Sequence, residues 1–222
     1  MRRLLSLLLL ALATPACGAD TDVQLWNVLS ANGRLSGRLM GSFDAVLRTS
    51  SEQDAVASAE ATAMLGWRLS AHATFWAGAG LSRLRVPGAG EATLHRGRQQ
   101  FNLALGKLGS ATLASRTTLE ERWWVGRGRN AGVRLREQLR LTQPIGRKRT
   151  ALFLTTEPIW NFNSTVWGQR AGLNRLRSSA GLSLALTPHL RGEFGYLNDY
   201  DFRPDRADRE IHAALTTFSL SF

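Results

Sequence analysis

Residues 133–142 read VRLREQLRLT, and the alternation in this stretch decides the fold class. Val133, Leu135, Leu139 and Leu141 alternate with charged or polar residues. Successive side chains of a β-strand point to opposite faces, so a period of two predicts a strand with one apolar and one polar face. The same period recurs along most of the chain, which predicts an all-β protein.

Ten long strands follow when this pattern is traced in both directions. They are expected at residues 34–48, 55–69, 73–85, 94–106, 111–124, 131–143, 150–162, 171–187, 190–202 and 209–222. Most exceed the five or six residues typical of soluble sheets, and they reach the roughly 9–11 residues with which a tilted strand crosses a membrane. Strand length therefore favours a membrane barrel over a β-sandwich.

The connections between these strands also indicate a barrel. Short turns such as SAHA (70–73) alternate with longer polar stretches such as NSTVWGQ (163–169). Outer-membrane barrels combine short periplasmic turns with longer outer loops and, in single bacterial chains, an even strand number. The sequence thus predicts a transmembrane antiparallel up-and-down β-barrel of about ten strands. Twelve strands are the alternative. That number results if residues 20–33 pair as a strand and if one of the ten expected ranges contains two strands rather than one.

The N-terminus has the layout of a secretory signal peptide. Arg2 and Arg3 precede an apolar run, and small residues lead to Ala19. That run is too short to span a bilayer as a helix, which takes roughly 20 residues. We expect cleavage after Ala19 rather than lipidation of Cys17, because the leucine that normally precedes a lipidated cysteine by three is missing.

Three regions are therefore expected. Residues 1–19 form the signal peptide, residues 20–33 form a segment that plugs the lumen, caps it or adds a strand, and residues 34–222 form the barrel. The destination is the bacterial outer membrane. Removal of the signal lowers the formal charge from +11 to +9. A secreted chain seldom meets nucleic acid, so we expect no such partner and place the arginines in the barrel.

The polar strand faces supply a lumen charge network. Arginine outnumbers glutamate in it, and guanidinium forks bind carboxylates in pairs. Such a network either fills the narrow barrel or lines a narrow path that prefers anions. The predicted members are Glu60, Arg68, Arg98, Arg116, Glu120, Arg122, Arg134, Arg136, Arg140, Glu157, Arg175, Arg177, Arg191 and Glu193.

The opposite faces are expected to meet lipid. Aromatic residues near the strand ends predict two interfacial girdles, with Trp67, Phe75, Trp123, Trp160 and Tyr200 as members. Glu137 fits this face badly, because it lies between Leu135 and Leu139. A bulge or a register change of one residue would turn it inward.

The chain ends with ALTTFSLSF (214–222), an alternating strand that closes on an aromatic residue. Phe218, Leu220 and Phe222 are predicted to face lipid and to form the signal that the outer-membrane assembly machinery recognises. The expected partners are that machinery, membrane lipid and lipopolysaccharide, and the expected state is a monomer.

No recognisable catalytic or metal-binding pattern is present. Without a cysteine in the cleaved chain and without close histidine pairs, we expect no zinc site and no cofactor. His212 and Ser219 are seven residues apart, so they face opposite sides of a strand. We expect no enzyme. A lipid-modifying outer-membrane enzyme and a soluble secreted β-sandwich that binds a ligand are the alternative functions.

Several segments resemble a known family. These are Gln24-Leu25-Trp26, TTEPIWNF (155–162), NRLRSSAGLSLALTPHLRGEFGYLND (174–199) and the final Phe222. Together they resemble the bacterial outer-membrane barrels of domain-of-unknown-function family 2490. The resemblance implies a β-barrel in the outer membrane and brings no agreed activity and no catalytic positions.

Overall fold

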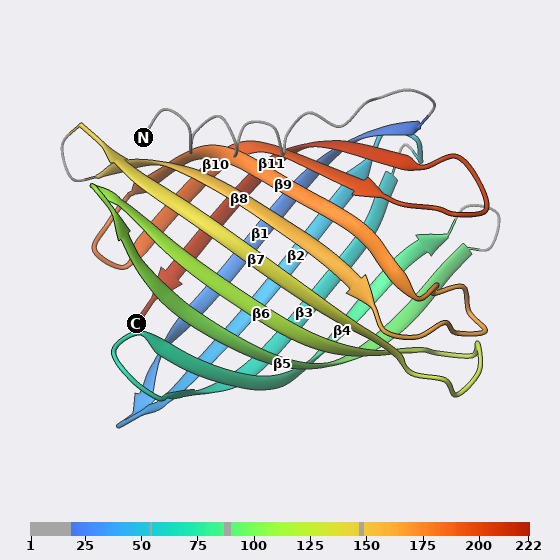
Figure 1. Cartoon of the computed structure of the whole chain (residues 1–222), viewed down its shortest axis with the longest axis horizontal. Coiled ribbons are helices and arrows are strands. Elements are labelled where there is room, and N and C mark those ends of the chain that lie inside the picture. The colour runs from blue at the N-terminus through green and yellow to red at the C-terminus, as the bar shows by residue number, and fades with distance from the viewer. Residues whose placement is uncertain (1–18, 54, 87–89, 147–148) are drawn as a thin grey trace.

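Eleven strands close into one barrel in a computed structural model that describes residues 19–53, 55–86, 90–146 and 149–222 (Figure 1). They are β1 (Asp20–Ser36), β2 (Leu39–Ser50), β3 (Ala55–Arg68), β4 (Ala73–Val86), β5 (Gly90–Leu108), β6 (Ala111–Trp124), β7 (Gly132–Ile145), β8 (Thr150–Asn161), β9 (Gly172–Ala185), β10 (Leu190–Asp201) and β11 (Arg209–Ser221). The predicted all-β, up-and-down barrel is confirmed.

Neighbouring strands are antiparallel except at the closure, where β1 and β11 run parallel. In Figure 1 the long connections β6–β7, β8–β9 and β10–β11 lie on the right, at what we call the loop end. The tight β1–β2 and β5–β6 connections and the C-terminus lie at the opposite end, the turn end. Both β1 and β11 run from the loop end to the turn end.

The expected strand 34–48 is wrong, because it contains a hairpin. Residues 34–36 end β1, and β2 begins at Leu39. Gly37 turns the chain with a φ of 53°, in the left-handed region that glycine adopts at little steric cost. Apolar residues keep the period of two through this turn, so alternation alone hides it.

The expectation of an even strand number is also wrong. Residues 20–36 form β1, a full-length wall strand between β2 and β11, rather than a plug or a cap. Because β1 enters at the loop end, it pairs with β11 in parallel, and an odd number of strands closes the barrel. The predicted signal peptide lies almost entirely in residues 1–18, outside the described residues.

Strict alternation of short and long connections does not hold. The β2–β3 and β4–β5 connections at the loop end are as short as those at the turn end, because β3 starts at Ala55 and β5 starts at Gly90. The longer connections follow β6, β8 and β10, as expected.

The two faces of the wall are reversed relative to those of a soluble protein. Large apolar side chains are exposed on the outside, whereas Glu120, Glu157 and Asp199 are buried inside. Trp67, Phe75, Trp123 and Trp160 of the predicted girdles are exposed, and Tyr200 bonds to Asp208 through its hydroxyl. Other exposed apolar residues include Leu25, Leu29, Phe43, Leu65, Leu81, Phe101, Leu139, Leu152, Leu182, Phe194 and Leu220.

Glu137 stays on the outer face, without a bulge or a change of register in the β6–β7 pair. The hydroxyls of Ser115 and Thr117, on the outer face of β6, donate to its two carboxylate oxygens at 2.5 Å each. The neighbouring strand thus supplies the hydrogen bonds that an outward carboxylate needs.

The C-terminus closes the seam between β11 and β1. The backbone N–H of Phe222 donates to the Asn32 carbonyl at 3.2 Å, and the Arg34 N–H donates to the Phe222 carbonyl at 3.1 Å. A Cβ atom on Gly33 would lie far inside van der Waals contact with that Phe222 oxygen. Glycine at position 33 therefore lets the terminal backbone approach.

We predict that Gly33→Ala opens this seam. The substitution should lower the unfolding free energy by about 1–3 kcal/mol, the usual cost of overpacking, measured by denaturant titration of the barrel in detergent. Gly97→Ala is the matched control, because its Cβ would meet Trp123 at an ordinary 3.5 Å. Equal stability of the two variants would contradict the described seam.

Candidate functional site

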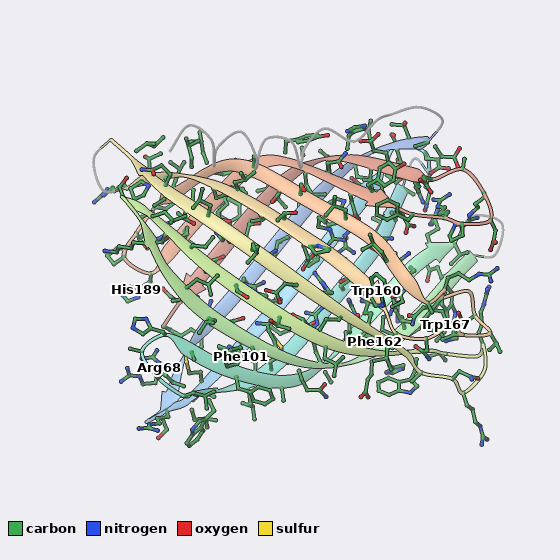
Figure 2. All side chains as sticks on the ribbon, in the orientation of Figure 1. Arg68, Phe101, Trp160, Phe162, Trp167 and His189 are labelled. Atoms are coloured by element: carbon green, nitrogen blue, oxygen red, sulfur yellow. The ribbon has the colours of Figure 1, made fainter. Side chains whose placement is uncertain are left out.

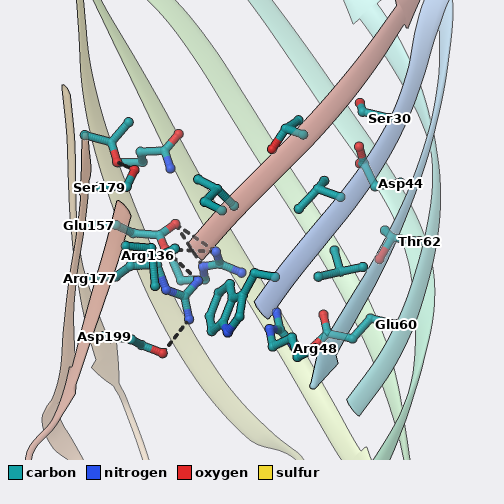
Figure 3. A pocket seen from close by; sticks show the side chains of 18 of the residues that line it. Ser30, Asp44, Arg48, Glu60, Thr62, Arg136, Glu157, Arg177, Ser179 and Asp199 are labelled. Carbon is teal, nitrogen blue, oxygen red and sulfur yellow. Dashed lines mark hydrogen bonds and ion pairs between the residues drawn. The ribbon is translucent and has the colours of Figure 1, made fainter. Parts of the chain in front are cut away.

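The lumen is the candidate site. A cavity of about 1010 Å³ runs along it and is lined by all eleven strands. Arginine and carboxylate side chains of distant strands face one another across it, with Arg48 and Glu60 on one side and Arg136, Glu157 and Arg177 on the other (Figure 3). Strand alternation brings these charges together, since each strand contributes every second residue to the lumen.

Glu120 of β6 is the most enclosed of these charges. Its side chain is fully buried and has four arginines within 4 Å. The nitrogens of Arg134 and Arg98 lie 2.9 Å and 3.2 Å from its carboxylate, and those of Arg136 and Arg96 lie 3.7 Å and 3.8 Å away. One carboxylate thus links β5, β6 and β7.

Two further carboxylates extend this cluster in both directions. Glu60 of β3 pairs with Arg48 of β2 and with Arg96, the latter at 2.6 Å. Arg96 also donates to the hydroxyl of Ser82 on β4. The contacts therefore continue from β6 back to β2.

Glu157 of β8 continues the contacts toward β9. Arg136 donates to both of its oxygens, at 2.8 Å and 3.0 Å, and Arg177 of β9 lies 3.3 Å from one of them. Arg177 also pairs with Asp199 of β10 at 3.1 Å. Two charge-assisted hydrogen bonds from one guanidinium fix both the distance and the orientation of this pair.

Trp26 of β1 closes the chain of contacts into a ring. The guanidinium carbon of Arg48 lies 4.2 Å from the centre of the indole, and that of Arg177 lies 4.7 Å away. The indole N–H donates to Gln24 at 2.6 Å, and Gln24 donates to Asp22 at 2.6 Å. We call the closed set the ion-pair ring: Trp26, Arg48, Glu60, Arg96, Glu120, Arg136, Glu157 and Arg177.

The ring spans the lumen in front of β10 and β11, whose inner faces carry an apolar patch beside Trp26. Leu197, Ile211 and Ala213 form a buried cluster with Trp26, and Leu215 packs against it. The Trp26 indole therefore packs against this apolar patch and makes cation–π contacts with two guanidinium groups. Trp26 thus links Arg177 of β9 to Arg48 of β2 across this apolar patch, and Asp199 of β10 pairs with Arg177 beside it.

The structure brings most of the predicted network together in the lumen. Glu120 is buried in the ring, and twelve other predicted residues line the cavity. Those twelve are Glu60, Arg98, Arg116, Arg122, Arg134, Arg136, Arg140, Glu157, Arg175, Arg177, Arg191 and Glu193. Arg68 is different: it is exposed at the turn end, where its guanidinium lies 3.8 Å from the sulfur of Met40 (Figure 2).

Sequence reasoning missed several members of the site. Arg48, Arg96 and Asp199 line the cavity and lie in strands that were predicted, and Arg96 is two residues from the predicted Arg98, so alternation alone could have found them. Trp26 and Asp22 belong to β1, and only recognition of that segment as a wall strand would have indicated them.

The loop end is held together by its connections. Gln169, in the β8–β9 connection, accepts a hydrogen bond from Arg122 of the lumen. Trp167 contacts Trp124 with ring centres 5.7 Å apart, and its N–H donates to the Asn130 carbonyl at 3.0 Å. These contacts fix the β6–β7 and β8–β9 connections against each other at the rim of the lumen.

In the β10–β11 connection, Asp208 accepts from the Arg203 N–H at 2.7 Å and from the Tyr200 hydroxyl at 2.8 Å. These two hydrogen bonds, the backbone one first, hold the pKa of Asp208 below its ordinary value. A charged Asp208 thus stabilises the turn that leads into β11.

The described residues contain no group of histidines, cysteines or carboxylates arranged to hold a metal ion. They also contain no helix with the length and apolar character of a membrane-spanning segment. His212 contacts the Tyr196 hydroxyl at 2.5 Å, whereas Ser219 lines the lumen. These two residues of β11 therefore cannot act together as base and nucleophile.

Comparison with known proteins gives a family match. The chain matches the family described as "protein of unknown function (DUF2490)" over residues 23–210, from β1 to the start of β11. An uncharacterized protein from Methylorubrum extorquens is 37% identical over 105 residues, which are 46% of each chain. That match thus spans about half the length of the curated relative. No solved structure matches the chain.

We predict that Glu120→Gln destabilises the barrel. Removal of the shared charge leaves four buried or partly buried guanidinium groups with too little negative charge nearby, and loss of one partner from a buried ion pair costs about 3–5 kcal/mol. Unfolding free energies in denaturant measure the effect. Glu121→Gln is the control, because Glu121 is the next residue on the opposite face and should cost less than about 0.5 kcal/mol. A similar small loss in both variants would mean that the ring does not carry stability.

Proposed function

Since this chain belongs to the family described as protein of unknown function (DUF2490), whose description assigns no activity, we propose a function from the barrel itself. The chain spans the bacterial outer membrane, and its lumen is a narrow path that prefers anions. The single observation that supports the proposal is the reversed wall, with apolar side chains outside and the ion-pair ring inside.

The apolar outer face favours a lipid environment. A soluble barrel would leave its exposed leucine, phenylalanine and tryptophan side chains in water, where large apolar patches promote association. A lipid-exposed wall must also satisfy every backbone polar group, and only closed barrels and helices do so. The parallel seam between β1 and β11 leaves no open edge.

The charge balance of the lumen favours anions. Among the described residues that line the cavity, thirteen are arginines and five are aspartates or glutamates. Clefts lined by one sign of charge within low-dielectric walls concentrate counter-ions of the opposite sign. The cavity lining includes residues on both sides of the ring, such as Arg175 toward the loop end and Ser219 toward the turn end.

A structural barrel without conductance is the second candidate. The ring crosses the lumen, and its paired charges stabilise the wall whether or not a solute passes. A lipid-modifying enzyme receives no support from His212 and Ser219, which lie on opposite faces. We propose no enzymatic activity and no cofactor.

The remaining interactions follow from the membrane setting. The outer wall contacts membrane lipid, and the C-terminal Phe218, Leu220 and Phe222 address the chain to the barrel assembly machinery. Loop arginines such as Arg127, which stacks on Trp124 at 4.9 Å, are placed to meet the phosphates of lipopolysaccharide. The proposed form is a monomer that binds no nucleic acid.

We predict anion-selective conductance in planar lipid bilayers. Under a salt gradient, the reversal potential should have the sign of anion selectivity and move toward zero in Arg134→Gln and Arg136→Gln, because each removes one lumen cation. Arg83→Gln is the control: Arg83 is an exposed residue of β4 outside the cavity lining, so selectivity should not change.

Three kinds of result would contradict this proposal in different ways. Cation selectivity, or equal effects of all three substitutions, would rule out the lumen arginines as the source of selectivity. If barrels inserted in the bilayer carry no current, the lumen is not a conduit, and the structural role is the remaining candidate. Recovery of the wild type as a soluble periplasmic protein would contradict the membrane placement itself.

A further inference from the structure

Arg116 of β6 differs from the arginines of the ion-pair ring. It lines the cavity and is exposed to it, on the turn-end side of Glu120. In the part of the chain that the structure describes, its guanidinium has neither a hydrogen bond nor an ion pair within 4 Å. Every arginine of the ring, in contrast, contacts a carboxylate.

None of the described carboxylates near Arg116 forms an ion pair with it. Glu157 and Glu193 pair with other arginines, and Asp44 lies on a distant strand. Both oxygens of Glu157 are bound by Arg136, and one is also paired with Arg177. Glu193 pairs with Arg140 at 2.6 Å. Asp44 belongs to β2. In Figure 3 it lies on the same side of the lumen as Glu60 and Arg48, opposite Glu157. The Arg116 charge is therefore free to meet a mobile anion.

Two amide side chains flank Arg116 in the same row of the sheet. Asn102 of β5 and Gln138 of β7 are its register partners on the two neighbouring strands, and both line the cavity. Adjacent strands lie about 4.8 Å apart. The three residues thus present their side chains to one region of the lumen.

The hydrogen bonds of these amides leave donors available. Gln100 donates to the Oδ1 atom of Asn102 at 3.0 Å, which directs the Asn102 carbonyl toward Gln100 and leaves its Nδ2 hydrogens for another acceptor. Gln138 makes no hydrogen bond through its side chain among the described residues. A guanidinium fork and two amide groups therefore offer N–H donors without an acceptor from the protein.

We propose that Asn102, Arg116 and Gln138 form a binding subsite for a tetrahedral oxyanion of the phosphate or sulfate class. A carboxylate has two oxygens, which the guanidinium fork alone engages. A tetrahedral oxyanion has further oxygens for the two amides. The ligand is either a free ion or the charged group of a larger solute. The subsite lies in the lumen assigned to the conduit, but binding there does not require that current flows.

Calorimetric titration with inorganic phosphate tests the subsite, using the folded barrel in a nonionic detergent at low ionic strength. Wild-type protein should bind phosphate saturably, and sulfate should compete more strongly than acetate. Arg116→Gln should weaken binding by about tenfold or more, because the charge-assisted hydrogen bonds are lost. Because the titration needs no bilayer, a failure of conductance and a failure of binding are separate results.

Two further variants distinguish specific binding at Arg116 from general attraction of anions by the positive charge of the lumen. Arg191→Gln removes a different lumen arginine, one that donates to Ser183 at 3.1 Å, and should retain most of the binding. Gln138→Glu places a carboxylate beside Arg116 and should abolish binding while the barrel still folds, as checked by its heat-modifiable migration on a gel. Absence of saturable phosphate binding in the wild type, or equal weakening by Arg191→Gln and Arg116→Gln, would overturn the proposal.

Discussion

The buried carboxylate of Glu120, with four guanidinium groups within 4 Å, is the interaction on which the rest of the lumen depends. Charges removed from water are tolerated in a protein only when they are paired and hydrogen-bonded. Glu60 and Glu157 extend the pairing in both directions, and Trp26 completes it where the inner faces of β10 and β11 are apolar. The ring therefore joins eight of the eleven strands through side chains, in addition to the backbone ladder.

The ring and the outer face have one physical origin. A strand with a period of two places one set of residues inside and the other outside, and in this chain the same alternation makes the interior charged and the exterior apolar. Glu137, a carboxylate on the outer face, is satisfied by two hydroxyls of the neighbouring strand. The seam between β11 and β1 depends on a glycine: Gly33 lacks a side chain at the point where the backbone of Phe222 approaches.

Alternation was sufficient to predict the fold class and most of the lumen, because the period of two encodes which face a residue takes. It could not locate the turn at Gly37, since apolar residues keep their spacing through it. It could not predict the parallel seam, because the direction of β1 depends on that turn. Alternation also could not predict which residues of the ring pair with one another. Which arginine meets Glu120 depends on the register between strands, and the role of Trp26 depends on the apolar faces of strands distant in sequence.

We propose that the apolar face of the wall meets lipid while the ion-pair ring lies inside. Tryptophan fluorescence tests it directly, in barrels reconstituted into bilayers with brominated acyl chains. One variant retains only the outward Trp160 and another retains only Trp26 of the ring, with the other tryptophans changed to phenylalanine. The account predicts strong quenching of Trp160 and weak quenching of Trp26. Quenching of Trp26 equal to or greater than that of Trp160 would contradict it.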